Sequence, residues 1–129
     1  MAKRTTTCLC GLPAPYADCC GSLHAGRTSA TTAEQLMRSR YSAFVVRDAA
    51  YLLRSWSSAT RPPELHLDDD LEWTGLEILS STGGSPFHTE GTVEFRATYK
   101  ADGTPGDQHE NSRFIRENGS WVYVEPQGR

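Results

Sequence analysis

The chain has 129 residues, a formal net charge of −3 and 37% hydrophobic residues. This length fits one domain of ordinary size that can fold without disulfides. No run approaches the roughly 18 apolar residues of a membrane-spanning helix, and no apolar signal segment follows the basic start. A mildly acidic chain also lacks the basic surplus of a generic nucleic-acid binder. We therefore expect a cytoplasmic protein with no membrane span and no nucleic-acid partner.

The charge is divided unevenly along the chain. Residues 1–60 carry seven Lys/Arg and three Asp/Glu, whereas residues 61–129 carry six and thirteen. The halves therefore have opposite net charge. This asymmetry either steers a charged partner or reflects a solvated face in each half.

The first part of the chain is predicted to be irregular, because residues 1–25 show neither helical nor strand periodicity. This segment holds all four cysteines of the chain, Cys8, Cys10, Cys19 and Cys20. A short irregular segment needs a cross-link to fold, so the cysteines are read as disulfides or as metal ligands. No secretion signal is evident, so we favour one Zn²⁺ held by all four thiolates; a disulfide or redox pair is the alternative.

A site with four thiolates has a closed coordination shell and no position for water. The zinc is therefore expected to be structural and to supply folding energy that the segment lacks. Gly11 would relax the backbone beside the first pair of cysteines, and Gly21 would let the chain leave after the second pair. His24 is a reserve ligand, for the case that the adjacent Cys19 and Cys20 do not both reach the ion.

A helix is predicted over about residues 32–47. Thr31 as its N-cap, with Glu34 three residues later, matches a capping box. Apolar residues recur at helical spacing after this start. The inward face would hold Met37, Tyr41 and Phe44.

Asp48 is predicted to cap a second helix, over about residues 49–56. A break at Pro62-Pro63 follows, and residues 64–70 are predicted to contain a further short turn of helix. The three carboxylates of residues 68–70 are predicted to lie in a solvated loop, since adjacent carboxylates cannot all face one ion.

Four strands are predicted in the second half, over residues 71–81, 89–100, 107–116 and 121–124. The second alternates cleanly between apolar and polar residues. Asp102-Gly103 and Pro105-Gly106 mark the connection to the third strand, and Asn118-Gly119 is a strong signal for a two-residue hairpin. Two or three helices followed by an antiparallel four-stranded meander predict an α+β fold.

The cysteine pattern resembles the SEC-C zinc motif, which ends the bacterial translocase motor SecA and occurs on many unrelated proteins. The rest of the chain resembles the YchJ family through pieces in family order. These pieces are residues 33–44 (AEQLMRSRYSAF), Tyr51-Leu52-Leu53, Trp56, Glu94-Phe95, residues 109–114 (HENSRF) and residues 121–124 (WVYV).

The resemblance implies two parts, an SEC-C zinc segment over residues 1–27 and a nuclear-transport-factor-2-like domain over residues 28–129. A domain of that type is a cone in which helices pack on a curved antiparallel sheet. The YchJ family has no established activity. The SecA motif is associated with the export chaperone SecB and with ribosomes, so the resemblance implies an accessory protein with a partner in export or translation.

A second hypothesis, of a different class, is an enzyme or small-molecule binder that uses the interior of the cone. Its candidate polar contacts are Arg40, Tyr41, Glu110 and Ser112. Tyr41 shares the helix face of Met37, which faces the sheet. Arg38 and Arg40 lie about 200° apart around the helix, so at most one of them joins Tyr41.

Glu110 and Tyr41 are the catalytic candidates under this hypothesis. On a strand, Glu110 shares a face with Phe114, whereas His109 lies on the opposite face, so these neighbours cannot act as a dyad. For the buried arginine two readings stay open. It either captures an anion inside the cone or forms a structural ion pair with Glu94 or Glu110.

Overall fold

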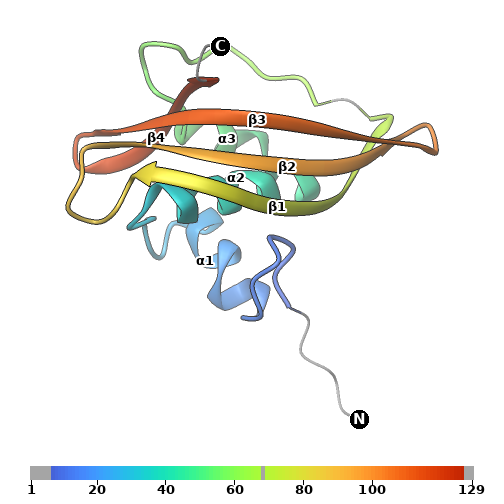
Figure 1. The fold of residues 1–129 in the computed structure, drawn as a ribbon, viewed down its shortest axis with the longest axis horizontal. Helices are drawn as coiled ribbons and strands as arrows, with labels where there is room; N and C mark the ends of the chain where they lie inside the picture. Colours follow the sequence, from blue (N-terminus) through green and yellow to red (C-terminus); the bar gives the residue numbers. More distant parts are fainter. Residues whose placement is uncertain (1–6, 68, 127–129) are drawn as a thin grey trace.

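The computed structural model describes residues 7–67 and 69–126. Its elements in chain order are a 3₁₀ turn η1 (Tyr16–Asp18), helices α1 (Cys20–His24), α2 (Ala33–Val46) and α3 (Ala49–Arg54), and strands β1 (Leu71–Gly83), β2 (Glu90–Ala101), β3 (Thr104–Glu117) and β4 (Ser120–Pro126). The predicted α+β order is confirmed. The helices cover one face of the sheet, and the cysteine-bearing segment lies beside α2 near β1 (Figure 1). No helix in residues 7–67 or 69–126 is long and apolar enough to cross a membrane.

Helix α2 begins one residue later than predicted. The hydroxyl of Thr32, not Thr31, accepts the first capping hydrogen bond, from the amide of Gln35 at 3.0 Å. Oε1 of Gln35 in turn accepts a hydrogen bond from the amide of Thr31 at 2.8 Å. Glu34 is free of the cap because it pairs with Arg38 one turn later, at 2.9 Å. The predicted capping box is therefore wrong in its residues, although the helix starts where such a signal was expected.

Helix α3 begins as predicted, because Oδ1 of Asp48 accepts a hydrogen bond from the amide of Tyr51 at 3.0 Å. It ends at Arg54, two residues early. The predicted turn of helix over residues 64–70 is wrong, since the described residues of that segment form no helix. Arg47 fixes this loop by donating to the carbonyl of Leu67 and to Asp69 at 2.6 Å; residue 68 of the predicted acidic loop lies outside the described residues.

The four strands form one antiparallel sheet in the order β1-β2-β3-β4. Both later connections are two-residue hairpins. Asp102-Gly103 has φ angles of 52° and 83°, and Asn118-Gly119 has 53° and 85°. Two consecutive positive φ angles are typical of the type I′ turn, which suits the twist of paired strands. Pro105-Gly106 was predicted to be part of the connection between the second and third strands. It lies inside β3 instead and pairs with β2.

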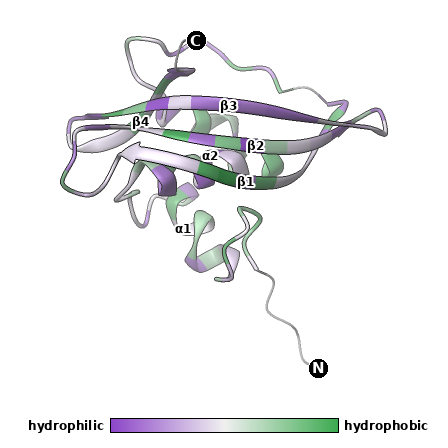
Figure 2. Cartoon of the chain, viewed as in Figure 1, coloured by the Kyte–Doolittle hydropathy of each residue, from purple (hydrophilic) through white to green (hydrophobic). Residues whose placement is uncertain are grey.

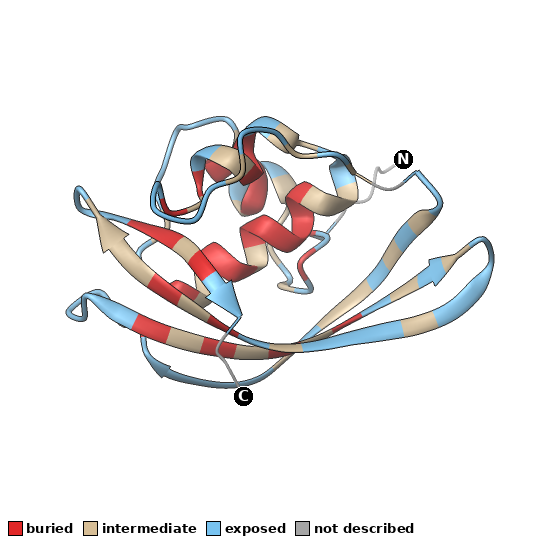
Figure 3. Cartoon of the chain, turned by 90° about the horizontal axis from the view of Figure 1, so that it is seen from above, coloured by how far each residue is buried: buried red, intermediate tan, exposed pale blue. Residues whose placement is uncertain are grey.

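The sheet curves around α2 (Figure 3). Register shifts interrupt the pairing of β1 with β2 after Trp73 and after Ile78, and that of β3 with β4 after Arg113. Such irregularities bend and twist strands locally. Figure 2 shows β3 as largely hydrophilic, whereas β1 carries a hydrophobic stretch where it passes α2. The curved inner face and α2 together enclose the core.

Two clusters of buried side chains form this core. The main cluster joins α2 to the sheet and contains Ala33, Leu36, Met37, Tyr41, Val93, Phe95, Ala97, Phe114 and Trp121. The inward positions predicted for Met37 and Tyr41 are thereby confirmed. The second cluster contains Leu23, Ala43, Tyr51 and Leu52. Leu23 belongs to α1, so the cysteine-bearing segment shares a core with α2 and α3.

Glu117 at the end of β3 ties the segment after α3 to the sheet. Its carboxylate accepts hydrogen bonds from the hydroxyl of Ser57 and from the amide of Ser58. These bonds lower the pKa of Glu117 below its ordinary value of 4.5, and the bond from Ser57 makes the largest contribution. A carboxylate whose pKa is lowered by folding adds stability above its unfolded pKa, and that stability is lost as the pH falls through the folded pKa.

We therefore expect Glu117→Gln to lower the free energy of unfolding at about pH 7, and the difference from wild type to shrink below about pH 4. Urea unfolding at both pH values measures this. Glu125→Gln is the matched control, because this carboxylate pairs with Arg113 at 3.9 Å and accepts no hydrogen bond from a described residue. A difference that is constant over this pH range would show that the carboxylate charge contributes nothing.

Candidate metal centre and central cavity

The side chains of Cys8, Cys10, Cys19 and Cys20 converge on one point. Their Sγ atoms all lie within 4.8 Å of one another, and none is disulfide-bonded. The Sγ atoms of Cys10 and Cys19 are 3.8 Å apart. A tetrahedron with Zn–S bonds of about 2.3 Å has edges of about 3.8 Å, whereas a disulfide needs about 2.0 Å. The cluster therefore has the dimensions of a four-thiolate metal site.

A tight turn presents the first pair of cysteines. The amide of Cys8 donates to the carbonyl of Ala14 at 2.7 Å, and the amide of Gly11 donates to the carbonyl of Cys8 at 3.2 Å. Gly11 has a φ of 99°, a conformation that residues with a Cβ rarely adopt. This turn presents the thiols of Cys8 and Cys10 to the same cluster.

The second pair lies where η1 meets α1. Adjacent Cys19 and Cys20 both reach the cluster, since Cys19 has an irregular backbone and precedes the first residue of α1. Gly21 is required for packing rather than for the predicted exit of the chain. A Cβ at Gly21 would lie 2.7 Å from the carbonyl oxygen and from a ring carbon of Tyr16. The chain turns away at Gly26, with a φ of 80°.

His24 is not a ligand of the cluster, so the alternative in which it replaces a cysteine is wrong. Its Nε2 lies 2.8 Å from the carbonyl oxygen of Ser39, which only accepts, so Nε2 carries the proton. Nδ1 then accepts from the hydroxyl of Tyr16 at 2.6 Å. The ring also lies 4.7 Å from that of Tyr51. Nε2 thus fastens α1 to α2, and Nδ1 ties α1 to η1.

The protonation states of Cys10, Cys19 and Cys20 depend on one another. Hydrogen bonds lower the pKa of Cys10 to about 5, and the hydrogen bond with Cys20 makes the largest contribution. The pKa of Cys19 is raised to about 11, and burial is the largest cause. The pKa of Cys20 is also raised, and its hydrogen bond to Cys10 is the largest cause. The cluster therefore stabilises a thiolate at Cys10, and the neighbouring thiols share their protons with it. A cation that displaces these protons would satisfy all four sulfurs together.

Side chains of α2 and α3 support the cluster from outside. Nη1 of Arg38 donates to the carbonyl of Cys10 at 2.8 Å, and the hydroxyl of Ser42 lies 3.9 Å from Sγ of Cys8. Arg54 of α3 donates to the carbonyl of His24 at 2.7 Å. Arg38 also places a positive charge beside a group that would become anionic with metal bound. The spacing of the cysteines does not predict these supporting contacts.

A cavity of about 200 Å³ lies between α2 and the inner face of the sheet. All four predicted ligand contacts, Arg40, Tyr41, Glu110 and Ser112, line it. Its other walls are mainly aromatic, from Phe44, Trp56, Trp73, Phe95 and Tyr123. None of the described residues before α2 lines the cavity, so the cysteine-bearing segment does not cover it. The functional role of these residues stays a prediction.

Arg40 is buried and its side chain is 4% exposed. Nη1 donates to the carbonyl of Leu52 at 2.8 Å and to the hydroxyl of Ser55 at 2.7 Å. The guanidinium also stacks 5.0 Å from the ring of Trp56 and 4.7 Å from that of Tyr123. Among the described residues it forms no ion pair, so the predicted structural pair with a carboxylate is wrong. The ring faces of Trp56 and Tyr123 contact the guanidinium in place of a carboxylate. Nothing in the sequence distinguishes these two aromatic residues from ordinary core residues.

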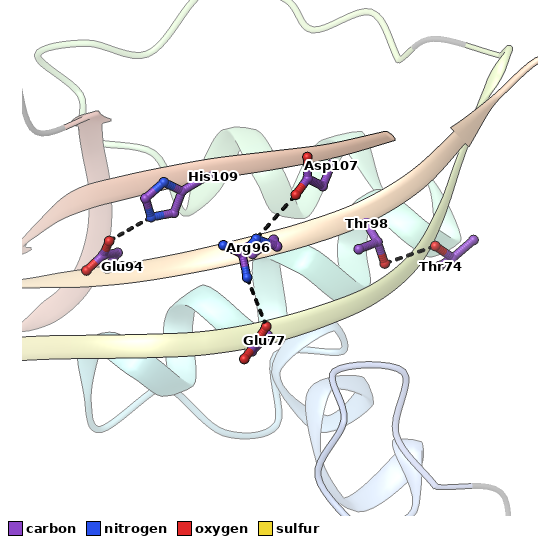
Figure 4. A network of polar contacts seen from close by, with 7 residues as sticks. All are labelled: Thr74, Glu77, Glu94, Arg96, Thr98, Asp107 and His109. Carbon is purple, nitrogen blue, oxygen red and sulfur yellow. Dashed lines mark hydrogen bonds and ion pairs between the residues drawn. The ribbon is translucent and has the colours of Figure 1, made fainter. Parts of the chain in front are cut away.

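Glu94 and Glu110 lie on opposite faces of the sheet. Glu94 pairs with His109 at 2.6 Å on the outer face, within the polar network that Figure 4 shows. This position keeps Glu94 out of reach of Arg40. Glu110 faces the cavity and accepts hydrogen bonds from Ser112, from Gln108 at 3.0 Å and from Tyr123 at 3.2 Å. The predicted separation of His109 from Glu110 is confirmed.

Comparison with known proteins agrees with this architecture. A model of the family described as "YchJ, middle NTF2-like domain" matches residues 32–126. A UPF0225 protein of Streptomyces coelicolor is 54% identical over 121 residues, with 94% of each chain covered. A UPF0225 protein of Corynebacterium glutamicum is 48% identical over 123 residues, with 95% of each chain covered.

Two solved structures are also similar. The solution structure of RPA3114, a SEC-C motif containing protein from Rhodopseudomonas palustris, has a TM-score of 0.84 at 31% identity, covering 96% of this chain and 99% of that one. The crystal structure of a SEC-C motif containing protein from Psychrobacter arcticus has a TM-score of 0.77 at 30% identity, covering 96% and 83%. The chain therefore belongs to the YchJ family and has an α+β, nuclear-transport-factor-2-like fold preceded by a cysteine cluster.

Proposed function

We propose that Cys8, Cys10, Cys19 and Cys20 bind one Zn²⁺ and that the metal has a structural role. The observation that carries this proposal is the convergence of four free thiols, with their Sγ atoms within 4.8 Å of one another. Four protein thiolates complete a tetrahedral shell and leave no position for water or substrate. The SEC-C motif of the similar solved structures supports the same assignment.

The proposed role of the metal is to hold residues 1–27 against the domain formed by residues 28–129. The described part of this segment has little regular structure of its own, apart from a 3₁₀ turn and a helix of five residues. Its hold on the domain depends on a few contacts, among them Leu23, His24 and Arg38. Metal binding supplies the folding free energy that such a segment cannot obtain from burial alone.

Cobalt substitution tests the ligand set directly. The protein is unfolded with a chelator, refolded with one equivalent of Co²⁺ without oxygen, and its visible spectrum is recorded. Four thiolates predict intense sulfur-to-cobalt charge transfer and the strong d–d bands of tetrahedral cobalt, with loss of both when Zn²⁺ is added. Weak bands of octahedral cobalt, or bands unchanged in Cys20→Ser, would contradict the proposed ligands.

We further propose a cytoplasmic accessory protein that uses the cysteine-bearing turn to contact a partner in export or translation. The resemblance to the SecA motif supports the class of partner. Leu9 at the tip of the turn is 41% exposed and lies beside two proposed ligands without being one.

Co-sedimentation with purified ribosomes and pull-down with SecB test this docking role. Leu9→Ser should weaken one of these interactions and Val46→Ser, similarly exposed on α2, should not; if neither partner binds the wild type, the docking role is wrong.

A further inference from the structure

The central cavity contains a buried cation that forms no direct ion pair with a described residue. Arg40 uses only Nη1 in hydrogen bonds, to Leu52 and Ser55. Its Nε and Nη2 donate to nothing else within residues 7–67 and 69–126, and no carboxylate there forms an ion pair with it. Burial lowers the pKa of Arg40 only to about 10, so the group stays charged at neutral pH. The carboxylate of Glu110 favours the charged form of Arg40 only through space, without contact. A buried charge without a contacting anion is costly, which favours an anion from outside the chain.

Other unused groups around the cavity are donors as well. Nε1 of Trp56 is buried and has no hydrogen-bond partner in the described part of the protein. Tyr41, 4% exposed, likewise makes no side-chain hydrogen bond to a described residue. Burial raises the pKa of Tyr41 to about 12, so its hydroxyl keeps its proton. Indole and phenol groups usually find an acceptor when buried.

Glu110, the one acidic group among the described residues that line the cavity, is already occupied. The carboxylate of Glu110 accepts from Gln108, Ser112 and Tyr123, three donors of the same sheet. It therefore offers a ligand little acceptor capacity, while the helix side offers donors without acceptors. This asymmetry selects a ligand that supplies oxygen acceptors and negative charge rather than a cation.

We propose that the central cavity binds a small carboxylate with a flat apolar body, whose oxygens accept from Arg40, Trp56 and Tyr41. The aromatic walls suit a ring, and the volume of about 200 Å³ fits its size, since a cavity of about 150 Å³ accommodates benzene. The site is independent of the proposed metal centre, whose residues do not line the cavity. Failure of one proposal therefore leaves the other intact.

Titration of the ¹⁵N-labelled, metal-loaded full chain tests the ligand class. The three probes are benzoate, benzyl alcohol and benzylamine, which share a ring and differ in charge. Benzoate should give saturable shifts of the Trp56 indole and of the Ala97 and Ser112 amides, with a Kd at least about tenfold lower than that of benzyl alcohol. Equal affinity for the alcohol, preference for benzylamine, or no binding of benzoate would each overturn the proposal.

Conservative variants test the donors without emptying the core. Trp56→Phe and Tyr41→Phe each remove one donor and keep a ring, so each should weaken benzoate binding several-fold, read from the Ala97 and Ser112 amides. Tyr99→Phe removes a hydroxyl on the same sheet from a residue that does not line the cavity, and should leave the Kd unchanged. Unchanged affinity in both donor variants, with their spectra otherwise native, would place the carboxylate elsewhere.

Discussion

Cys10→Ser is expected to release the metal and to open residues 7–27, while the sheet keeps its fold. The substitution removes one of four thiolates and leaves a site that cannot close around Zn²⁺. Structural zinc sites in small peptides are worth about 10–16 kcal/mol, so even partial loss is large. We expect the free energy of local opening to fall by about 4 kcal/mol or more.

Hydrogen exchange measures this opening residue by residue. In Cys10→Ser the amides of Cys8 and Cys19 should exchange rapidly, whereas those of Val93 and Phe114 should remain protected. Leu9→Ser is the matched control in the same turn. Leu9 is partly exposed and offers no ligand, so its change is expected to stay within about 0.5 kcal/mol. Unaltered protection and metal content in Cys10→Ser would remove the basis for a structural site.

Phe114→Ala is expected to cost about 3–5 kcal/mol of the free energy of unfolding. The ring is fully buried between α2 and the sheet and lies 5.8 Å from that of Tyr123. Its removal leaves a void in the main cluster that rigid strands on either side cannot close. Phe87→Ala is the control, because Phe87 is 94% exposed and its truncation should change stability by at most about 0.5 kcal/mol.

Urea unfolding of the two phenylalanine variants, with equal m-values, gives the comparison. A cost below about 1 kcal/mol for Phe114→Ala would show that the main cluster is loosely packed. Such a result would also undermine the central cavity, whose walls are continuous with this cluster.

The strands were predictable because their signals are local. In β2 the predicted alternation is matched by the burial of Gly91, Val93, Phe95 and Ala97, and Asn118-Gly119 adopts the turn that its residues favour. The resemblance implied a curved sheet, but the positions at which the strands bend were not predictable from the residues. Register shifts after Trp73 and Ile78 interrupt the pairing there, and the alternation of apolar and polar residues does not mark them.

The two sites differ in what the sequence could reveal. The four cysteines were recognisable from spacing alone, since few roles require four thiols in so short a segment. The role of His24 was not recognisable, because its partner carbonyl of Ser39 belongs to another helix. For Arg40 no sequence signal favoured aromatic faces over a carboxylate as its partner. The roles of His24 and Arg40 both depend on contacts between segments that lie far apart in the sequence.

The metal content of the purified chain tests the central claim most directly. Elemental analysis of protein prepared without added metal, together with native mass spectrometry, counts the ions bound to each chain. We predict one zinc per chain, with no reactive thiol until a chelator removes it. Protein without stoichiometric zinc, with its four cysteines paired as disulfides or freely reactive, would contradict the account.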